Sequence, residues 1–203
     1  ANGNPSSIST LMDRGAEGDY AEPRKGYTAL VMACKKGNAE AADMLLKRGV
    51  SISIPSKNGM EPLMWASKNG FLDVVKVLVE RGVGINAFDP HNWTALHFAS
   101  KYGHKDIVEF LANSGASIIL KESLEEGKTA MMLAAQYGRR ETVILLIDKG
   151  SNVNAITTRD ELTALILAAK EGHKGTVRAL LERGADANLS DSYGWTPLHF
   201  CAS

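Results

Sequence analysis

Five histidines are the side chains best suited to acid–base chemistry in this 203-residue chain, because histidine titrates near neutral pH. His97 and His199 end two copies of a Thr-x-Leu-His pattern, and His104 and His173 each follow a glycine. A general base needs a converging partner, and apolar residues replace His97 in other copies of the pattern. We therefore predict that these four histidines satisfy backbone groups between neighbouring units, that His91 is solvated, and that the chain is not an enzyme.

Motifs for a metal ion or a nucleotide cofactor are missing from the sequence. It has no His-Glu-x-x-His, no Cys-x-x-Cys and no phosphate-binding loop, and Gly82-Val-Gly-Ile-Asn-Ala lacks the third glycine of a dinucleotide-binding loop. Two cysteines, Cys34 and Cys201, are too few for a disulfide framework and favour a reducing compartment. We predict no catalytic residue, no metal ligand and no cofactor.

Composition narrows the function classes further. Apolar residues make up 44% of the chain and 23 basic residues balance 23 acidic ones, which excludes intrinsic disorder and gives no reason to expect a nucleic acid as partner. No apolar run approaches the roughly 18 residues that a membrane-spanning helix needs, and the first seven residues do not resemble a signal peptide. We expect no membrane insertion and an intracellular location, with the cytoplasm preferred and the nucleus as the alternative.

The elements that carry these residues follow from an internal repeat. One series has intervals of 33, 33, 35, 34 and 33 residues and consists of Thr28, Glu61, Thr94, Thr129, Thr163 and Thr196. A second series, the mid-unit glycines, runs in step and consists of Gly37, Gly70, Gly103, Gly138 and Gly172. A third consists of Gly15, Gly49, Gly82, Gly115, Gly150 and Gly184. Because three series share one period, the chain is a tandem array of short units.

Each unit is predicted to hold two short helices and a turn. The threonines of the first series suit N-caps, and apolar residues such as Leu96 and Ala99 follow them at helical spacing. A mid-unit glycine such as Gly103 ends the first helix by adopting a positive φ. Helices this short do not persist alone, so stacking must bury their apolar faces in a one-dimensional array.

These residues resemble the ankyrin repeat over essentially the whole chain. Thr196-Pro-Leu-His and Thr94-Ala-Leu-His are similar to the family's Thr-Pro-Leu-His signature, and Gly184-Ala-Asp-Ala-Asn is similar to its Gly-Ala-Asp-Val-Asn close. The resemblance implies an all-α, L-shaped solenoid of helix-turn-helix units with projecting β-hairpin fingers. It also implies recognition by the finger tips and the exposed ends of the first helices. Candidate sites of asparagine hydroxylation under this resemblance are Asn86, Asn154 and Asn188.

The chain is interpreted as a single array, residues 1–203. It divides into a partial unit at 1–25, whole units at 26–58, 59–91, 92–126, 127–160 and 161–193, and a truncated unit at 194–203. Because it starts and stops in mid-repeat without capping repeats, we expect a piece of a longer array or of a larger protein. Cys34 and Cys201 fall five units apart, on the order of 50 Å at about 8–10 Å per stacked helix, which excludes a mutual disulfide.

Two columns of residues are not dictated by the repeat and form the predicted partner-binding surface on the concave face. The finger column is the residue before each cap, namely Tyr27, Met60, Trp93, Lys128, Leu162 and Trp195. The helix-end column is the pair before each mid-unit glycine and supplies Lys35, Lys36, Lys68, Lys101, Tyr102 and Tyr137. Exposed aromatic rings suit contact hot spots, and the local lysine excess suits a partner with acidic and apolar residues. The alternatives are rings that only stiffen the fingers and lysines that are simply solvated.

The leading prediction is a non-enzymatic scaffold or adaptor that binds a peptide or a folded protein, either as a monomer or within a hetero-complex. One alternative is a regulatory or substrate-docking segment of a larger enzyme or channel. A weaker alternative is nucleic-acid binding by lysine and tyrosine, which the lack of arginine in the helix-end column disfavours. The longer connector between Gly115 and Thr129 carries Glu122, Glu125 and Glu126 and is either a specificity insertion or a tolerated bulge.

Overall fold

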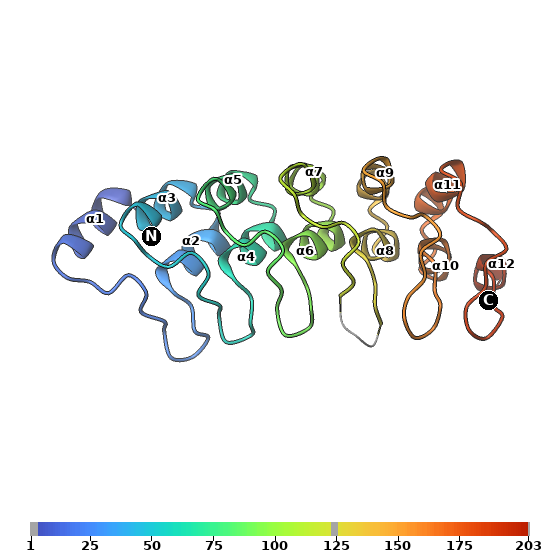
Figure 1. The fold of residues 1–203 in the computed structure, drawn as a ribbon, viewed down its shortest axis with the longest axis horizontal. Helices are drawn as coiled ribbons and strands as arrows, with labels where there is room; N and C mark the ends of the chain where they lie inside the picture. Colours follow the sequence, from blue (N-terminus) through green and yellow to red (C-terminus); the bar gives the residue numbers. More distant parts are fainter. Residues whose placement is uncertain (1–3, 123–125, 203) are drawn as a thin grey trace.

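The computed structural model describes residues 4–122 and 126–202, which form two rows of short helices (Figure 1). The inner row contains α2 (Ala29–Lys36), α4 (Pro62–Asn69), α6 (Ala95–Tyr102), α8 (Ala130–Gln136), α10 (Ala164–Lys170) and α12 (Pro197–Ala202). The outer row contains α1 (Pro5–Asp13), α3 (Ala39–Lys47), α5 (Leu72–Glu80), α7 (Lys105–Asn113), α9 (Arg140–Asp148) and α11 (Lys174–Glu182). The all-α solenoid is confirmed, and none of the described helices is long and apolar enough to cross a membrane.

The joining loops, which we call the fingers, project from the inner row on the side away from the outer row, as Figure 1 shows. The figure also places α2 and α12 near opposite ends of the stack. Cys34 in α2 is buried, Cys201 in α12 is exposed, and both are free thiols. The prediction that these two cysteines form no mutual disulfide is therefore confirmed.

Threonine caps start four of the inner helices, as predicted. The Oγ1 atoms of Thr28, Thr94, Thr129 and Thr163 each accept a hydrogen bond from the backbone N–H three residues later. Glu61 is the N-cap residue of α4, and its side chain makes no capping hydrogen bond. There Pro62 at the first helical position has a φ already suited to the helix.

A left-handed glycine stops the inner helices. Gly103 after α6 has φ of 78°, and its N–H returns to the carbonyls of Ala99 and Ser100. The other mid-unit glycines also have positive φ, between 67° and 81°. The chain can therefore turn directly into the outer helix of the same unit.

A side chain from the next unit covers four of the mid-unit glycines. A Cβ added to Gly138 would lie 2.7 Å from Nδ1 of His173, so glycine is needed for close approach as well as for φ. The covering side chains are Phe71, His104, Arg139 and His173. Three of them also hydrogen-bond a carbonyl of the preceding unit: His104 to Lys68 at 3.1 Å, Arg139 to Lys101 at 3.0 Å and His173 to Gln136 at 3.0 Å. The predicted role of His104 and His173 between units is confirmed.

One continuous apolar core runs through the stack, from Leu30 to Ala185. Small residues lie where the inner helices meet, and Ala66, Ala99 and Ala134 are fully buried there. Met32 is 40% exposed, whereas Trp65 and Phe98, the equivalent residues of the next two units, are buried. Burial of the apolar faces by stacking is thus how helices of six to nine residues are held in place.

The fingers differ from the implied β-hairpins, because in the described residues each holds one isolated bridge at most. The bridges join Phe88 to Thr94, Lys121 to Thr129 and Ile156 to Thr163. Local side-chain hydrogen bonds shape the fingers instead of a ladder. In one finger Asp89 Oδ1 accepts from the N–H groups of His91 and Trp93, both at 2.9 Å, and Asp191 does the same for Tyr193 and Trp195. In the longer finger Glu122 is buried, while Glu125 lies outside the described residues.

Two of the asparagines named for hydroxylation tie adjacent units together. Asn86 Oδ1 accepts from the N–H of Ser117 at 2.8 Å, and its Nδ2 donates to the carbonyl of Gly115 at 3.4 Å. Asn154 makes the equivalent pair of bonds one unit further along the chain. A polar side chain of one finger therefore fixes the start of the next.

Candidate functional site

The structure divides the finger column between two environments. Tyr27, Trp93 and Leu162 are half-buried and Trp195 is 46% exposed. Met60 and Lys128 are buried, so the expectation that they lie on an exposed edge is wrong.

These two exceptions have a local cause. The second finger folds back against the helices, where the Ser56 hydroxyl donates to the Met60 carbonyl at 2.8 Å. Met60 lies in a small apolar cluster with Val31, Met64, Trp65 and Phe98. The ammonium of Lys128 reaches out of its buried site to form an ion pair with Glu126.

In the helix-end column, the ammonium of Lys35 lies beside two aromatic rings that contact each other edge to face, with centroids 5.6 Å apart. Its Nζ is 4.5 Å from the ring centroid of Tyr27 and 4.6 Å from that of Trp65. It also donates a hydrogen bond to the Tyr27 hydroxyl at 3.0 Å. Since an ammonium within about 6 Å of a ring centroid is attracted to the ring face, the two rings fix Lys35 between the inner row and the fingers.

Lys68 has the same arrangement one unit further along. Its Nζ is 5.3 Å from the ring centroid of Trp65, and 5.9 Å from those of Phe98 and Tyr102. Trp65 therefore contacts two successive lysines. This ring is itself held in place, because its Nε1 donates to the hydroxyl of Ser56 at 3.0 Å.

Lys101 completes the series in α6. Its Nζ is 5.1 Å from Trp93, 5.9 Å from Tyr102 and 4.7 Å from Tyr137, measured to the ring centroids. Trp93 is fixed in turn by a hydrogen bond from its Nε1 to Glu122 at 3.1 Å. We call Lys35, Lys68 and Lys101 the lysine row.

The lysine row carries positive charge that no described carboxylate neutralises. The ion pairs in residues 4–122 and 126–202 involve other basic side chains. Lys36 is exposed beside the row, and Tyr102 and Tyr137 are 38% and 39% exposed. The surface over α2, α4 and α6 thus presents three positioned ammonium groups next to accessible tyrosine rings.

This pattern stops at α8. Gln136 replaces the lysine there, and Lys170 in α10 lies 5.9 Å from the ring centroid of Phe200. A small pocket of about 180 Å³ lies on this part of the surface, where Leu162 contributes to its wall. The charged residues that line it have both signs: Glu126, Lys128, Arg159, Asp160, Lys170 and Glu171. Basic and acidic side chains are therefore equal in number around this pocket, in contrast to the lysine row.

Sequence reasoning missed the part that Trp65 and Phe98 play here, because neither belongs to the two predicted columns. They are 7% and 8% exposed, but each ring is also close to an ammonium of the lysine row. For Trp65 the signal was present in the spacing. Trp65 and Lys68 stand at i and i+3, where side chains on a helix are neighbours. Phe98 had no such signal, because its lysine is Lys68 of the preceding unit.

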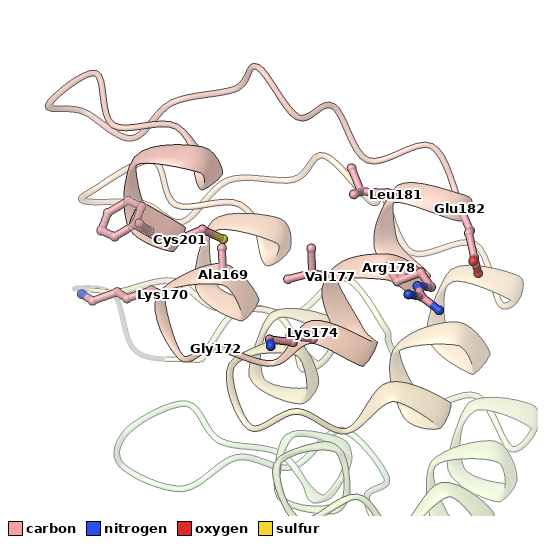
Figure 2. A pocket seen from close by; sticks show the side chains of 10 residues that line it. Ala169, Lys170, Gly172, Lys174, Val177, Arg178, Leu181, Glu182 and Cys201 are labelled. Atoms are coloured by element: carbon pink, nitrogen blue, oxygen red, sulfur yellow. The ribbon is translucent and has the colours of Figure 1, made fainter. Parts of the chain in front are cut away.

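A larger cavity of about 550 Å³ lies among α10, α11 and α12 (Figure 2). Figure 2 shows Ala169, Val177 and Cys201 around it, with Arg178 and Glu182 toward one side. Apart from Lys170, whose carbon chain contributes to the wall, it contains no residue of the two predicted columns. The cavity is therefore separate from the surface of the lysine row.

His97 and His199 form structural hydrogen bonds within their own units, so the expectation that they satisfy backbone groups between units is wrong for these two. Nδ1 of His97 accepts from the N–H of Thr94 at 3.1 Å, and Nε2 is 3.0 Å from the carbonyl of Leu120. These partners assign the proton to Nε2. Burial lowers the pKa of His97 to about 4, against the opposing effects of the Leu120 carbonyl and of Asp89. Within the described residues, no three His, Cys, Asp or Glu side chains gather as a metal site would require.

Comparison with known proteins agrees with this architecture. A family model described as "Ankyrin repeats (3 copies)" matches residues 1–89, 85–157 and 149–203. The crystal structure of the human ASB11 ankyrin repeat domain is similar, with a TM-score of 0.86 and 23% sequence identity over 97% of this chain and 86% of that one. No curated protein matches the sequence. With matches along its whole length, the chain belongs to the ankyrin repeat family.

Proposed function

We propose that this array is a non-enzymatic interaction module that binds a protein or peptide on the surface between its inner row and its fingers. Ankyrin repeats are in general protein–protein interaction modules, which supports the class. The observation that carries the proposal is the lysine row, because its ammonium groups are positioned by rings and form no ion pair with a carboxylate in the described part of the chain.

The energetic argument is one of preorganisation. An exposed lysine normally loses side-chain freedom when it binds, which costs affinity. Lys35, Lys68 and Lys101 have already lost much of that freedom because the rings hold them. Tyr102 and Tyr137 add accessible ring area, of the kind that is enriched at interface hot spots. A partner with acidic and apolar side chains matches both features.

The test begins with ligands selected from a random peptide library displayed on phage. Their affinity is then measured for the wild-type chain, for Tyr102→Ala, and for a triple variant with Lys35→Ala, Lys68→Ala and Lys101→Ala. The matched control replaces Lys76, Lys105 and Lys174 of the outer row with alanine. We expect the triple variant to lose about tenfold or more in affinity, since exposed charge pairs contribute roughly two- to fivefold each.

Unchanged affinity for both binding-surface variants, with unchanged far-UV circular dichroism, would reject this surface as the site. Trp93→Ala is a less clean probe. It removes a half-buried ring that also bonds Glu122, so a loss of affinity there could come from a displaced finger.

A further inference from the structure

The spacing of the lysine row contains information about the shape of the ligand. Lys35 Nζ and Lys68 Nζ lie 4.6 Å and 5.3 Å from the same Trp65 centroid, so they are about 10 Å apart or less, the spacing of packed helices. Lys68 and Lys101 share Tyr102 in the same way, each 5.9 Å from its centroid. These shared rings set upper limits of about 10 Å and about 12 Å on the two separations. Because the three lysines occupy equivalent positions in successive inner helices, which pack about 8–10 Å apart, we take one helix spacing per unit as the repeat of the row.

Three regular peptide conformations can be compared with this spacing. A β-strand advances about 3.3 Å per residue with side chains on alternate faces, so acidic residues on one face repeat at roughly 6.6 or 13 Å, and neither matches. A polyproline II helix has three residues per turn and rises about 3.1 Å per residue, so every third side chain lies on one face at about 9.3 Å. This repeat falls within the spacing of the lysine row.

An α-helix with an acidic residue every seventh position also repeats at about 10.5 Å. It would need about 15 residues to reach all three lysines, and isolated helices of that length are marginal in water. A polyproline II segment spans the row in seven residues and is largely preformed before binding. Aromatic-lined surfaces such as that of Tyr102 and Tyr137 are the usual recognition sites for this conformation.

We infer that the lysine row binds an acidic polyproline II segment with a carboxylate at every third residue. This inference rests on the proposed function and specifies its ligand. The three carboxylates pair with Lys35, Lys68 and Lys101, one per unit. The residues between them, proline above all, pack on the exposed rings of Tyr102 and Tyr137.

Single-stranded nucleic acid fits this surface less well, because bases bind by stacking on open ring faces. The Lys35 ammonium lies over the rings of Tyr27 and Trp65, at 4.5 Å and 4.6 Å, and the Lys101 ammonium lies over that of Tyr137, at 4.7 Å. These ammonium groups hinder flat stacking of a base, whereas the smaller proline ring can pack against the exposed part of a tyrosine. The lysine row also lacks the planar guanidinium groups that bind phosphate in two-point contacts.

The test uses two seven-residue peptides of proline and glutamate with identical composition. One carries glutamate at its first, fourth and seventh positions, and the other carries it at the first, third and seventh. Fluorescence anisotropy at low salt measures Kd for each. We expect the period-three peptide to bind about two- to fivefold more tightly, because both peptides place glutamate at the first and seventh positions and the shifted peptide loses only the central charge pair.

A charge-swap cycle then assigns the contacts. Lys68→Glu should weaken binding of the period-three peptide, and a peptide with lysine at its central acidic position should recover it. The outer-row substitution Lys105→Glu is the matched control and should leave Kd unchanged. Thermal unfolding followed by circular dichroism checks that each variant is folded.

Equal affinity for the two peptides would overturn the inference, since only undirected charge attraction would remain. Tighter binding of a peptide with glutamate at every seventh position, or of a single-stranded oligonucleotide, would overturn it as well. If neither heptapeptide binds while library-selected ligands still depend on the lysine row, the inference fails and the proposed function stands. If those ligands are also insensitive to Lys68→Glu, both fail.

Discussion

Acidification should weaken the fold through one buried side chain, His97. Nδ1 of His97 accepts the N–H of Thr94, and Nε2–H donates to the carbonyl of Leu120. A proton added to Nδ1 would place two donors against each other in a site that is 1% exposed. This is why burial lowers the pKa of His97 to about 4, whereas an unfolded histidine titrates near 6.5.

The direction of this pH effect on stability follows from the linkage between proton binding and folding. Because the folded-state pKa is lowered, only the unfolded chain takes up this proton as the pH falls from about 6.5 toward 4, and stability is lost over that interval. At about 1.4 kcal/mol per pH unit, the full loss is about 3 kcal/mol, and about 2 kcal/mol of it is lost by pH 5. Above pH 8 the contribution is fully present.

Urea unfolding at pH 8 and pH 5 measures the effect, with His97→Met as the control. The chain itself offers this substitution, since Met132 occupies the equivalent position in α8 and its sulfur lies 3.5 Å from the N–H of Thr129. We expect the wild type to lose about 2 kcal/mol more than His97→Met between the two pH values. Parallel losses for the two proteins would refute the argument that His97 is buried and neutral.

Three further outcomes are expected. Gly59→Ala should lower the free energy of unfolding by about 1–3 kcal/mol, because Gly59 has φ of 79° and a Cβ there would lie 2.1 Å from Cδ of Pro90; no change in urea midpoint would contradict this. Thr163→Ala should cost about 1 kcal/mol through loss of the α10 cap, measured in the same assay. Under native conditions a disulfide reagent such as Ellman's should modify Cys201 quickly and Cys34 only on unfolding, because burial raises the pKa of the Cys34 thiol to about 12; two fast thiols would contradict that placement.

Sequence periodicity was sufficient for the fold because the repeat fixes local signals in register. A left-handed glycine and a small-residue helix face recur from unit to unit, and a threonine cap recurs in every whole unit except that of Glu61. A weak signal in one unit is therefore supported by the same signal in the others. The same reasoning across units gave the wrong result for Met60 and Lys128, because all residues of the finger column were assumed to share one environment. Their burial depends on how each finger folds against particular neighbours, which no single-unit pattern reports.

The lysine row shows the other limit of sequence reasoning. The lysines were predicted as contacts from their column, but their rings come from the preceding finger, the same helix and the next unit. Only the packed stack brings Trp65 between Lys35 and Lys68. An interpretation of the sequence that is confined to each unit identifies the lysines but misses the aromatic rings of other units that position them.

The covered mid-unit glycines have a consequence for how such a chain can change its length. Each junction needs a left-handed glycine on one side and a covering side chain on the other, and Phe71, His104, Arg139 and His173 all serve. Since the joining chemistry is nearly the same at every junction, a whole unit could be deleted or duplicated between equivalent glycines without leaving an unmatched surface. Part of a unit could not be deleted or duplicated in this way, because two helix faces that are not complementary would then be brought into contact.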